Sequence, residues 1–152
     1  FADRGGEKAV RSELQAIKMH VYEDGVIDQS EVKLKGHSIE CRINAEDPDR
    51  DFMPQAGEVK TFVAPGGLGV RMDSHVRSGY RIPPFYDSMI GKLIVHAPSR
   101  DEAITRMRGA LSDLRIGPGK STAPLHSKLL DRSEFRTVDM DIHWVERMLK
   151  ED

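Results

Sequence analysis

Strict alternation of apolar and polar side chains in the first half of the chain most constrains its fold. Residues 39–44 read Ile-Glu-Cys-Arg-Ile-Asn. Successive side chains of a strand point to opposite faces of a sheet. This spacing therefore predicts a strand with an apolar face at Cys41 and a charged face at Arg42.

Further short apolar alternations predict a series of strands up to His96. They cover Val32 and Leu34, residues 59–63, residues 68–72 and residues 93–95. Clusters of proline, glycine, aspartate and serine separate these runs and are typical of turns. We therefore expect several short strands joined by tight connections.

Helical spacing of apolar residues surrounds the strand region. We expect helices over 7–21 and 100–114, the second begun by a capping box of Ser99 and Glu102. Two more are expected, one after Thr122 and one from about Asp141. This order predicts an α+β fold, a mainly antiparallel sheet with flanking helices. We divide the chain into an N-terminal helical segment, 1–30, and one domain over 31–150.

Composition excludes several classes of protein. The 152 residues carry 23 basic and 25 acidic side chains, a net charge of −2, which argues against nucleic acid as a partner. A single cysteine excludes an internal disulfide, and the histidine spacings predict no metal site. No apolar run approaches the roughly 20 residues of a membrane helix. The first residue is Phe rather than Met, which leaves open a segment of a longer chain.

Arg42 has two interpretations. On spacing alone it is a surface arginine in an ion pair, worth about 0–1 kcal/mol. The alternative is an arginine that stabilises an oxyanion, because guanidinium stays charged and presents a planar set of donors.

Two glycine-rich segments invite a phosphate-binding interpretation. Residues 66–69 are followed by a predicted strand rather than a helix, which favours a turn. Residues 117–121 end in Lys120 and Ser121 before a predicted helix, but Leu114 stands where a P-loop needs glycine. A small nucleotide binder around Lys120 stays as a weaker alternative.

Residues 83–93 form the densest group of chemically active side chains. They read Pro-Pro-Phe-Tyr-Asp-Ser-Met-Ile-Gly-Lys-Leu. The segment is either a loop that leads into a strand or a site in which Asp87 orients an arginine through a bidentate pair. Periodicity does not decide between them.

Four segments in order resemble one known family. Residues 36–48 read Gly-His-Ser-Ile-Glu-Cys-Arg-Ile-Asn-Ala-Glu-Asp-Pro, and residues 64–75 contain Ala-Pro-Gly-Gly-Leu-Gly-Val-Arg and Asp-Ser-His. Residues 86–93 read Tyr-Asp-Ser-Met-Ile-Gly-Lys-Leu, and residues 141–146 read Asp-Ile-His-Trp-Val-Glu. Together they are similar to the C-terminal domain of biotin carboxylase, from about residue 31 to residue 149.

The resemblance implies a part in ATP- and bicarbonate-dependent carboxylation of biotin on a carrier protein. In that family, Arg42 matches the arginine that stabilises the oxygen of deprotonated biotin. Asp87 matches a position of the family's third motif, and we predict that it is the partner that holds or releases Arg42. Ile142 matches a residue of the adenine pocket, and Leu68 and Arg71 match the dimer interface. The resemblance further implies MgATP, a biotin carboxyl carrier protein and a carboxyltransferase as partners, in a cytoplasmic enzyme of the acetyl-CoA carboxylase type.

The chain also departs from the family. The ATP-grasp segments, with their phosphate and metal ligands, do not occur in it, and Leu68 stands where the family has phenylalanine. We therefore expect the isolated chain to be inactive. The alternative is a non-enzymatic assembly or binding module that keeps only the fold.

Overall fold

The computed structural model describes residues 33–151, and the compact unit considered below begins at Gly36. The predicted helix over 7–21 and the predicted domain boundary at residue 30 lie outside the described residues. Residues 33–35 form no strand, so the predicted strand at Val32 and Leu34 is wrong in its described part.

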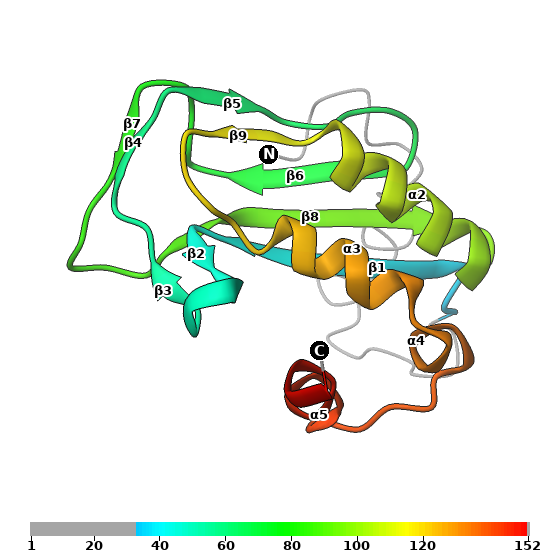
Figure 1. Ribbon diagram of the computed structural model, residues 1–152. Helices are drawn as coiled ribbons and strands as arrows, with labels where there is room; N and C mark the ends of the chain where they lie inside the picture. The colour runs from blue at the N-terminus through cyan, green and yellow to red at the C-terminus, as the bar shows by residue number, and fades with distance from the viewer. Residues whose placement is uncertain (1–32, 152) are drawn as a thin grey trace, which may run out of the picture. The chain divides into compact units, whose positions relative to one another are not determined.

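A three-stranded antiparallel sheet forms the centre of the unit, in the order β1-β8-β6 (Figure 1). Its strands are β1 (His37–Asn44), β8 (Met89–Ala97) and β6 (Val70–Ser74). Cys41 lies opposite Leu93, and Arg42 opposite Lys92. The ladder is irregular after Ile43, because Ile43 pairs with Gly91 but Asn44 pairs with Met89.

The segments between and after the strands of this sheet form three two-stranded antiparallel pairs. They are β2 (Glu46–Asp47) with β3 (Met53–Pro54), β4 (Gly57–Val59) with β7 (Tyr80–Ile82), and β5 (Thr61–Val63) with β9 (Arg115–Gly117). The predicted single strand over 59–63 is wrong, because the chain changes pairing partner at Lys60. Val59 is buried whereas Val63 is exposed, so the two halves serve different surroundings.

Four helices complete the described unit. They are α2 (Arg100–Asp113), α3 (Ala123–Asp131), α4 (Ser133–Thr137) and α5 (Trp144–Glu151), and a 3-10 turn, η2 (Pro48–Arg50), follows β2. Ser99 caps α2 as predicted, because its Oγ accepts from the Glu102 amide at 3.3 Å. The Glu102 carboxylate accepts from the Ser99 hydroxyl at 2.8 Å, a bond between the two side chains in place of the backbone bond of a capping box. The last helix begins at Trp144 rather than Asp141, whose carboxylate accepts from the His143 amide instead.

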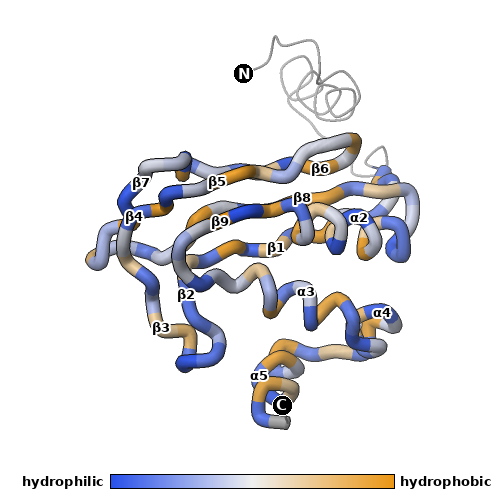
Figure 2. The backbone as a smooth tube through the Cα atoms, turned by 45° about the horizontal axis from the view of Figure 1, so that its top comes forward, coloured by the Kyte–Doolittle hydropathy of each residue, from blue (hydrophilic) through white to orange (hydrophobic). Residues whose placement is uncertain are grey.

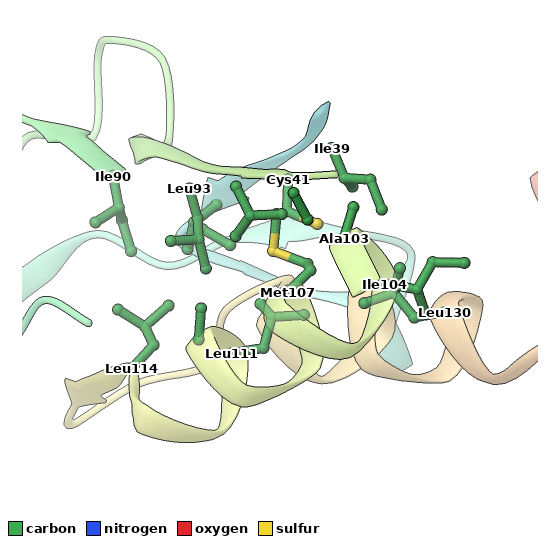
Figure 3. Packing of buried hydrophobic residues seen from close by; sticks show 14 of the residues in the cluster. Ile39, Cys41, Ile90, Leu93, Ala103, Ile104, Met107, Leu111, Leu114 and Leu130 are labelled. Atoms are coloured by element: carbon green, nitrogen blue, oxygen red, sulfur yellow. The ribbon is translucent and has the colours of Figure 1, made fainter. Parts of the chain in front are cut away.

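The core lies between the apolar face of the sheet and α2. Figure 3 shows Met107 of α2 pointing toward Cys41 and Leu93 of the sheet, and Met107 and Leu93 are fully buried. The alternation of apolar and polar residues along β1 and β8 is visible in Figure 2. Because one face of the sheet is buried, Arg42 on the other face is left open to ligands. The predicted α+β fold with a mainly antiparallel sheet is confirmed.

Candidate functional site

Arg42 and Asp87 meet on the polar face of the sheet. An Nη2 hydrogen of Arg42 is donated to Oδ2 of Asp87 at 2.5 Å, and the two side chains are 53% and 58% exposed. The residues lie far apart in sequence, but Asp87 comes just before β8, the antiparallel partner of β1. Strand pairing therefore brings the carboxylate to the arginine.

The carboxylate of Asp87 uses both of its oxygens. Oδ1 accepts the amide hydrogen of Met89 at 3.0 Å, which is the local turn that aspartate favours before a strand. Oδ2 is thereby aimed at Arg42. An ion pair this exposed adds about 0–1 kcal/mol to stability. The arrangement therefore orients the guanidinium more than it stabilises the fold.

The loop that carries Asp87 is tied to the end of β1. The amide of Ala45 donates to the Ser88 carbonyl at 2.8 Å, and the Ser88 hydroxyl donates to Glu46. The Asn44 side-chain amide donates to the same Glu46 oxygen at 3.0 Å. These contacts hold the loop beside the strand, so the distance between Arg42 and Asp87 is set by the fold.

The backbone of Arg42 is held from a third element that the sequence analysis did not include in the site. Its carbonyl oxygen accepts from the Thr122 hydroxyl at 3.1 Å and lies 2.8 Å from Nε2 of His126. Burial lowers the pKa of His126 below its ordinary value of 6.5, although the bond to the Arg42 carbonyl opposes this. The predicted helix start at Thr122 was the available signal, but nothing in the spacing pointed to Arg42.

Further charges lie on the same face of the sheet. Lys92, opposite Arg42, is 3.6 Å from the carboxylate of Glu40. Arg71 on β6 donates to both oxygens of Asp73 at 2.7 Å, and these bonds lower the pKa of Asp73. Two cations, Arg42 and Lys92, thus stand side by side between carboxylates, an arrangement suited to a small anionic or polar ligand.

The remaining residues from the sequence analysis lie elsewhere. Ile142 is in the turn before α5 and is 91% exposed, and Leu68, equally exposed, is in the loop before β6. The predicted strand start at Leu68 is wrong, because Gly67 and Gly69 adopt positive φ values and form a turn. Neither residue belongs to the pair made by Arg42 and Asp87.

The two groups that would bind a phosphate in the weaker phosphate-loop interpretation, the Lys120 ammonium and the Thr122 amide, already have partners within the chain. Lys120 lies 3.1 Å from the carboxylate of Asp49, which raises the pKa of Lys120. The amide of Thr122, at the start of α3, donates to the Asn44 carbonyl at 3.0 Å. The helix start is therefore used to bind β1 rather than a phosphate.

Residues 33–151 offer neither a metal-binding cluster nor a membrane-spanning helix. This part of the chain holds no cluster of three or more histidine, cysteine or acidic side chains with a geometry that suits a metal ion. Nor does it contain a helix with the length and apolar character that crossing a membrane requires.

Comparison with known proteins decides the family. The model of the biotin carboxylase C-terminal domain matches residues 40–147. The chain belongs to this family. Biotin carboxylase of Pseudomonas aeruginosa is 49% identical over 126 residues, which cover 83% of this chain and 28% of that protein. The enzyme of Haemophilus influenzae is 50% identical over 121 residues, 80% of this chain and 27% of its own length. The chain thus spans little more than a quarter of these relatives.

Solved structures give the same result. Biotin carboxylase of Campylobacter jejuni superimposes with a TM-score of 0.75 at 41% identity, over 80% of this chain and 27% of that one. The biotin carboxylase subunit of a pyruvate carboxylase gives a TM-score of 0.78 at 39% identity, over 82% of this chain and 28% of that one. The biotin carboxylase domain of Hydrogenobacter thermophilus 2-oxoglutarate carboxylase, described as a dimer with MgADP, ADP and bicarbonate, gives 0.77 at 40% identity, over 80% and 27%. The predicted family resemblance is confirmed.

Proposed function

We propose that this chain is the C-terminal part of a biotin carboxylase and that Arg42 stabilises the ureido oxygen of carrier-bound biotin. Loss of the ureido proton places negative charge on that oxygen before the nitrogen is carboxylated. A fixed guanidinium beside it lowers the barrier, because it need not reorient when the charge develops.

The observation that carries the proposal is the bond between Arg42 and Asp87. It holds a half-exposed guanidinium at the surface of a rigid sheet, with one nitrogen engaged and the rest of the planar group free to approach a ligand. Asp87 sets the direction of Arg42 and, by releasing it, would let the guanidinium reach the substrate. The ATP- and bicarbonate-binding groups come from the part of the enzyme that this chain does not span.

A domain graft tests this function. Residues 36–151 replace the matching segment of the Pseudomonas aeruginosa relative, and ADP formation that depends on both biotin and bicarbonate is measured. The graft is expected to be active. Arg42→Ala is expected to lower biotin-dependent turnover about 100-fold or more, the usual loss for one oxyanion-stabilising donor, while the KM for ATP stays within about twofold.

Arg81→Ala is the matched control, since Arg81 is an exposed arginine on β7, a strand of another sheet. It is expected to leave turnover unchanged. An Arg42→Ala graft that carboxylates biotin at the wild-type rate would remove Arg42 from the mechanism.

We also infer that the 152-residue chain alone forms no carboxybiotin, because positioning of phosphate and metal ions lies outside it. Bicarbonate-dependent ADP release by the purified chain would contradict this. The relatives include pyruvate and 2-oxoglutarate carboxylases, so the acetyl-CoA carboxylase type stays a prediction about the transferase partner. Ile142, fully open in this chain, is proposed to complete the adenine pocket against the ATP-binding part.

Association is proposed through the face that carries Leu68 and Arg71. The observation that favours it is an exposed leucine, 91% accessible, in the loop before β6, the strand whose Arg71 is held by Asp73. Leu68→Ser is expected to weaken dimers in sedimentation, whereas Val63→Ser, a change at another exposed apolar residue, is expected to have no effect. A strictly monomeric graft with full activity would contradict a functional dimer.

A further inference from the structure

The first turn of α3 pairs with the free edge of β1 at Arg42. Within residues 33–151, β1 is an edge strand, since its one strand partner there is β8. Figure 1 shows α3 beside β1, and the two elements are in contact. Backbone groups on an unpaired strand edge need other partners. Here α3 supplies them over residues 42–44.

Thr122 behaves as a partner of the strand rather than as a helix cap. It stands at the N-cap position of α3, yet its hydroxyl makes no capping bond. The hydroxyl donates to the Arg42 carbonyl at 3.1 Å and accepts from the Asn44 amide at 3.0 Å. Its own amide donates to the Asn44 carbonyl at 3.0 Å. Three outward-facing backbone groups of β1 are thus bound by one buried threonine.

His126, one turn further along α3, binds the same Arg42 oxygen. Its Nε2 lies 2.8 Å from that carbonyl. A carbonyl oxygen only accepts hydrogen bonds, so Nε2 must carry a hydrogen. The oxygen has two lone pairs, and Thr122 and His126 occupy both. Burial lowers the pKa of the His126 ring and so disfavours a positive charge next to Arg42.

These contacts lie where the register of the strand ladder shifts. The register between β1 and β8 slips after Ile43, which leaves Ile90 as an extra residue on β8. Such bulges loosen a ladder locally and often lie beside functional side chains. The contacts from α3 begin one residue before the slip, at Arg42, and end just after it, at Asn44.

We propose that Thr122 and His126 are positioning residues for Arg42, which fix its backbone so that the guanidinium meets Asp87 and the substrate in one geometry. The inference rests on the proposed function for Arg42, but its structural part is independent of that function. Misplacement of a reacting group by about 1 Å can cost on the order of 100-fold in rate.

Nuclear magnetic resonance of the full 152-residue chain tests the contact without any substitution. Long-range proton–nitrogen correlation of the imidazole assigns its tautomer. We expect His126 to carry its hydrogen on Nε2 at pH 7.5. A His126 ring protonated only on Nδ1 would overturn the proposal.

Variants of the same chain test the consequence. Thr122→Val and His126→Leu remove the donors, whereas Thr122→Ser and His126→Gln keep one. We expect the order parameter of the Arg42 Nε–H bond to fall by about a third in the first two variants, as in Asp87→Asn, and to stay near wild type in the conservative pair. Thr137→Val, which removes an equivalent hydroxyl bond within α4, is the matched control.

The outcomes are distinct. An unchanged Arg42 order parameter in folded His126→Leu overturns the proposal, even where Thr122→Val fails to fold. In the grafted enzyme, both donor-removing variants are expected to lower kcat with biotin about tenfold and to leave the KM for ATP unchanged. An inactive wild-type graft would count against the proposed function alone, because the resonance measurements on the chain need no activity.

Discussion

Two arginine–aspartate pairs lie on the same face of the sheet, and they are built in different ways. Arg71 and Asp73 are two residues apart on β6, so any extended strand brings them together. Arg42 and Asp87 are 45 positions apart and meet only because β1 pairs with β8. The first pair is a local property of one strand, whereas the second is a product of the whole fold.

The hydrogen bonds of the two aspartates also differ, local for Asp73 and shared between elements for Asp87. Asp73 uses both of its oxygens on Arg71. Asp87 divides its oxygens between Arg42 and the Met89 amide, and the backbone of Arg42 is held in turn by α3. A pair that is oriented at both ends is suited to present a guanidinium to a substrate. A closed bidentate pair is better suited to a fixed interface.

Gly91→Ala is expected to destabilise the sheet that connects the two pairs, where β8 packs against β6. A Cβ at Gly91 would lie 2.6 Å from the Asp73 carbonyl oxygen and 2.9 Å from Cε of Met72, both on β6. The strands must then move apart, at an expected cost of about 1–3 kcal/mol in the free energy of unfolding. Urea unfolding followed by circular dichroism measures this.

Gly109→Ala is the control for that change. Nothing lies within 4 Å of a Cβ at Gly109, which is inside α2. There, alanine is expected to stabilise the chain by up to about 1 kcal/mol, because it favours a helix more than glycine does. Equal stability of the two variants would show that β6 does not pack against β8 as described.

Loss of one carboxylate should distinguish the pairs in function. Asp87→Asn is expected to lower biotin-dependent turnover of the graft about tenfold, since the guanidinium loses its charged partner and its fixed direction. Asp73→Asn is expected to cost less than about threefold at high protein concentration, because Asp73 only orients a residue proposed for association. Steady-state rates with free biotin measure both, and equal losses would show that the two pairs serve the same role.

The two pairs also show how far the sequence could predict the structure. Period-two alternation at Cys41 and Arg42 identified β1 and its charged face, and Ser99 with Glu102 identified the start of α2, because these signals are local. The split at Lys60 and the helix α4 were missed, since pairing partners and short helices are set by tertiary contacts. Arg42 and Asp87 were named through family resemblance, while periodicity alone favoured a surface ion pair.

Residues that act through the backbone were beyond sequence reasoning altogether. Thr122 was recognised only as a helix start, which is the usual role of threonine in that position. Its hydroxyl instead bonds β1, and the contact spans some 80 positions of sequence. No local pattern records a contact of this kind.

The pH dependence of stability should show how His126 of α3 contributes to the free energy of unfolding. The pKa of His126 is lowered in the folded chain, so the unfolded chain takes up this proton first. The contribution of neutral His126 to the free energy of unfolding is constant above about pH 6.5. It is lost as the pH falls below that value, by up to about 1.4 kcal/mol per pH unit. Asp73, whose pKa is also lowered, acts only as the pH falls below its ordinary value of 3.8.

Urea unfolding of wild type and His126→Gln at pH 7.5 and 5.5 measures the effect. Glutamine keeps a donor for the Arg42 carbonyl but does not titrate. The wild type is therefore expected to lose more stability between these pH values than the variant. An identical loss in both would mean that His126 is not held neutral against β1.

The smallest effect expected is that of the two arginine–aspartate pairs on stability itself. The side chains of both pairs are more than one-third exposed, so water and salt screen the attraction. Arg42→Ala and Arg71→Ala are each expected to lower the free energy of unfolding by less than about 1 kcal/mol, and by less still in 1 M salt. Urea titrations at two salt concentrations measure both. A loss above about 2 kcal/mol for Arg42→Ala alone would show that the fold-dependent pair holds the sheet together, and that the cost of removing it in an assay reflects unfolding rather than lost orientation. We expect a small loss of unfolding free energy in both variants and a large loss of turnover in Arg42→Ala alone. That result would show that Arg42 acts through the position of its charge and not through the stability of the fold.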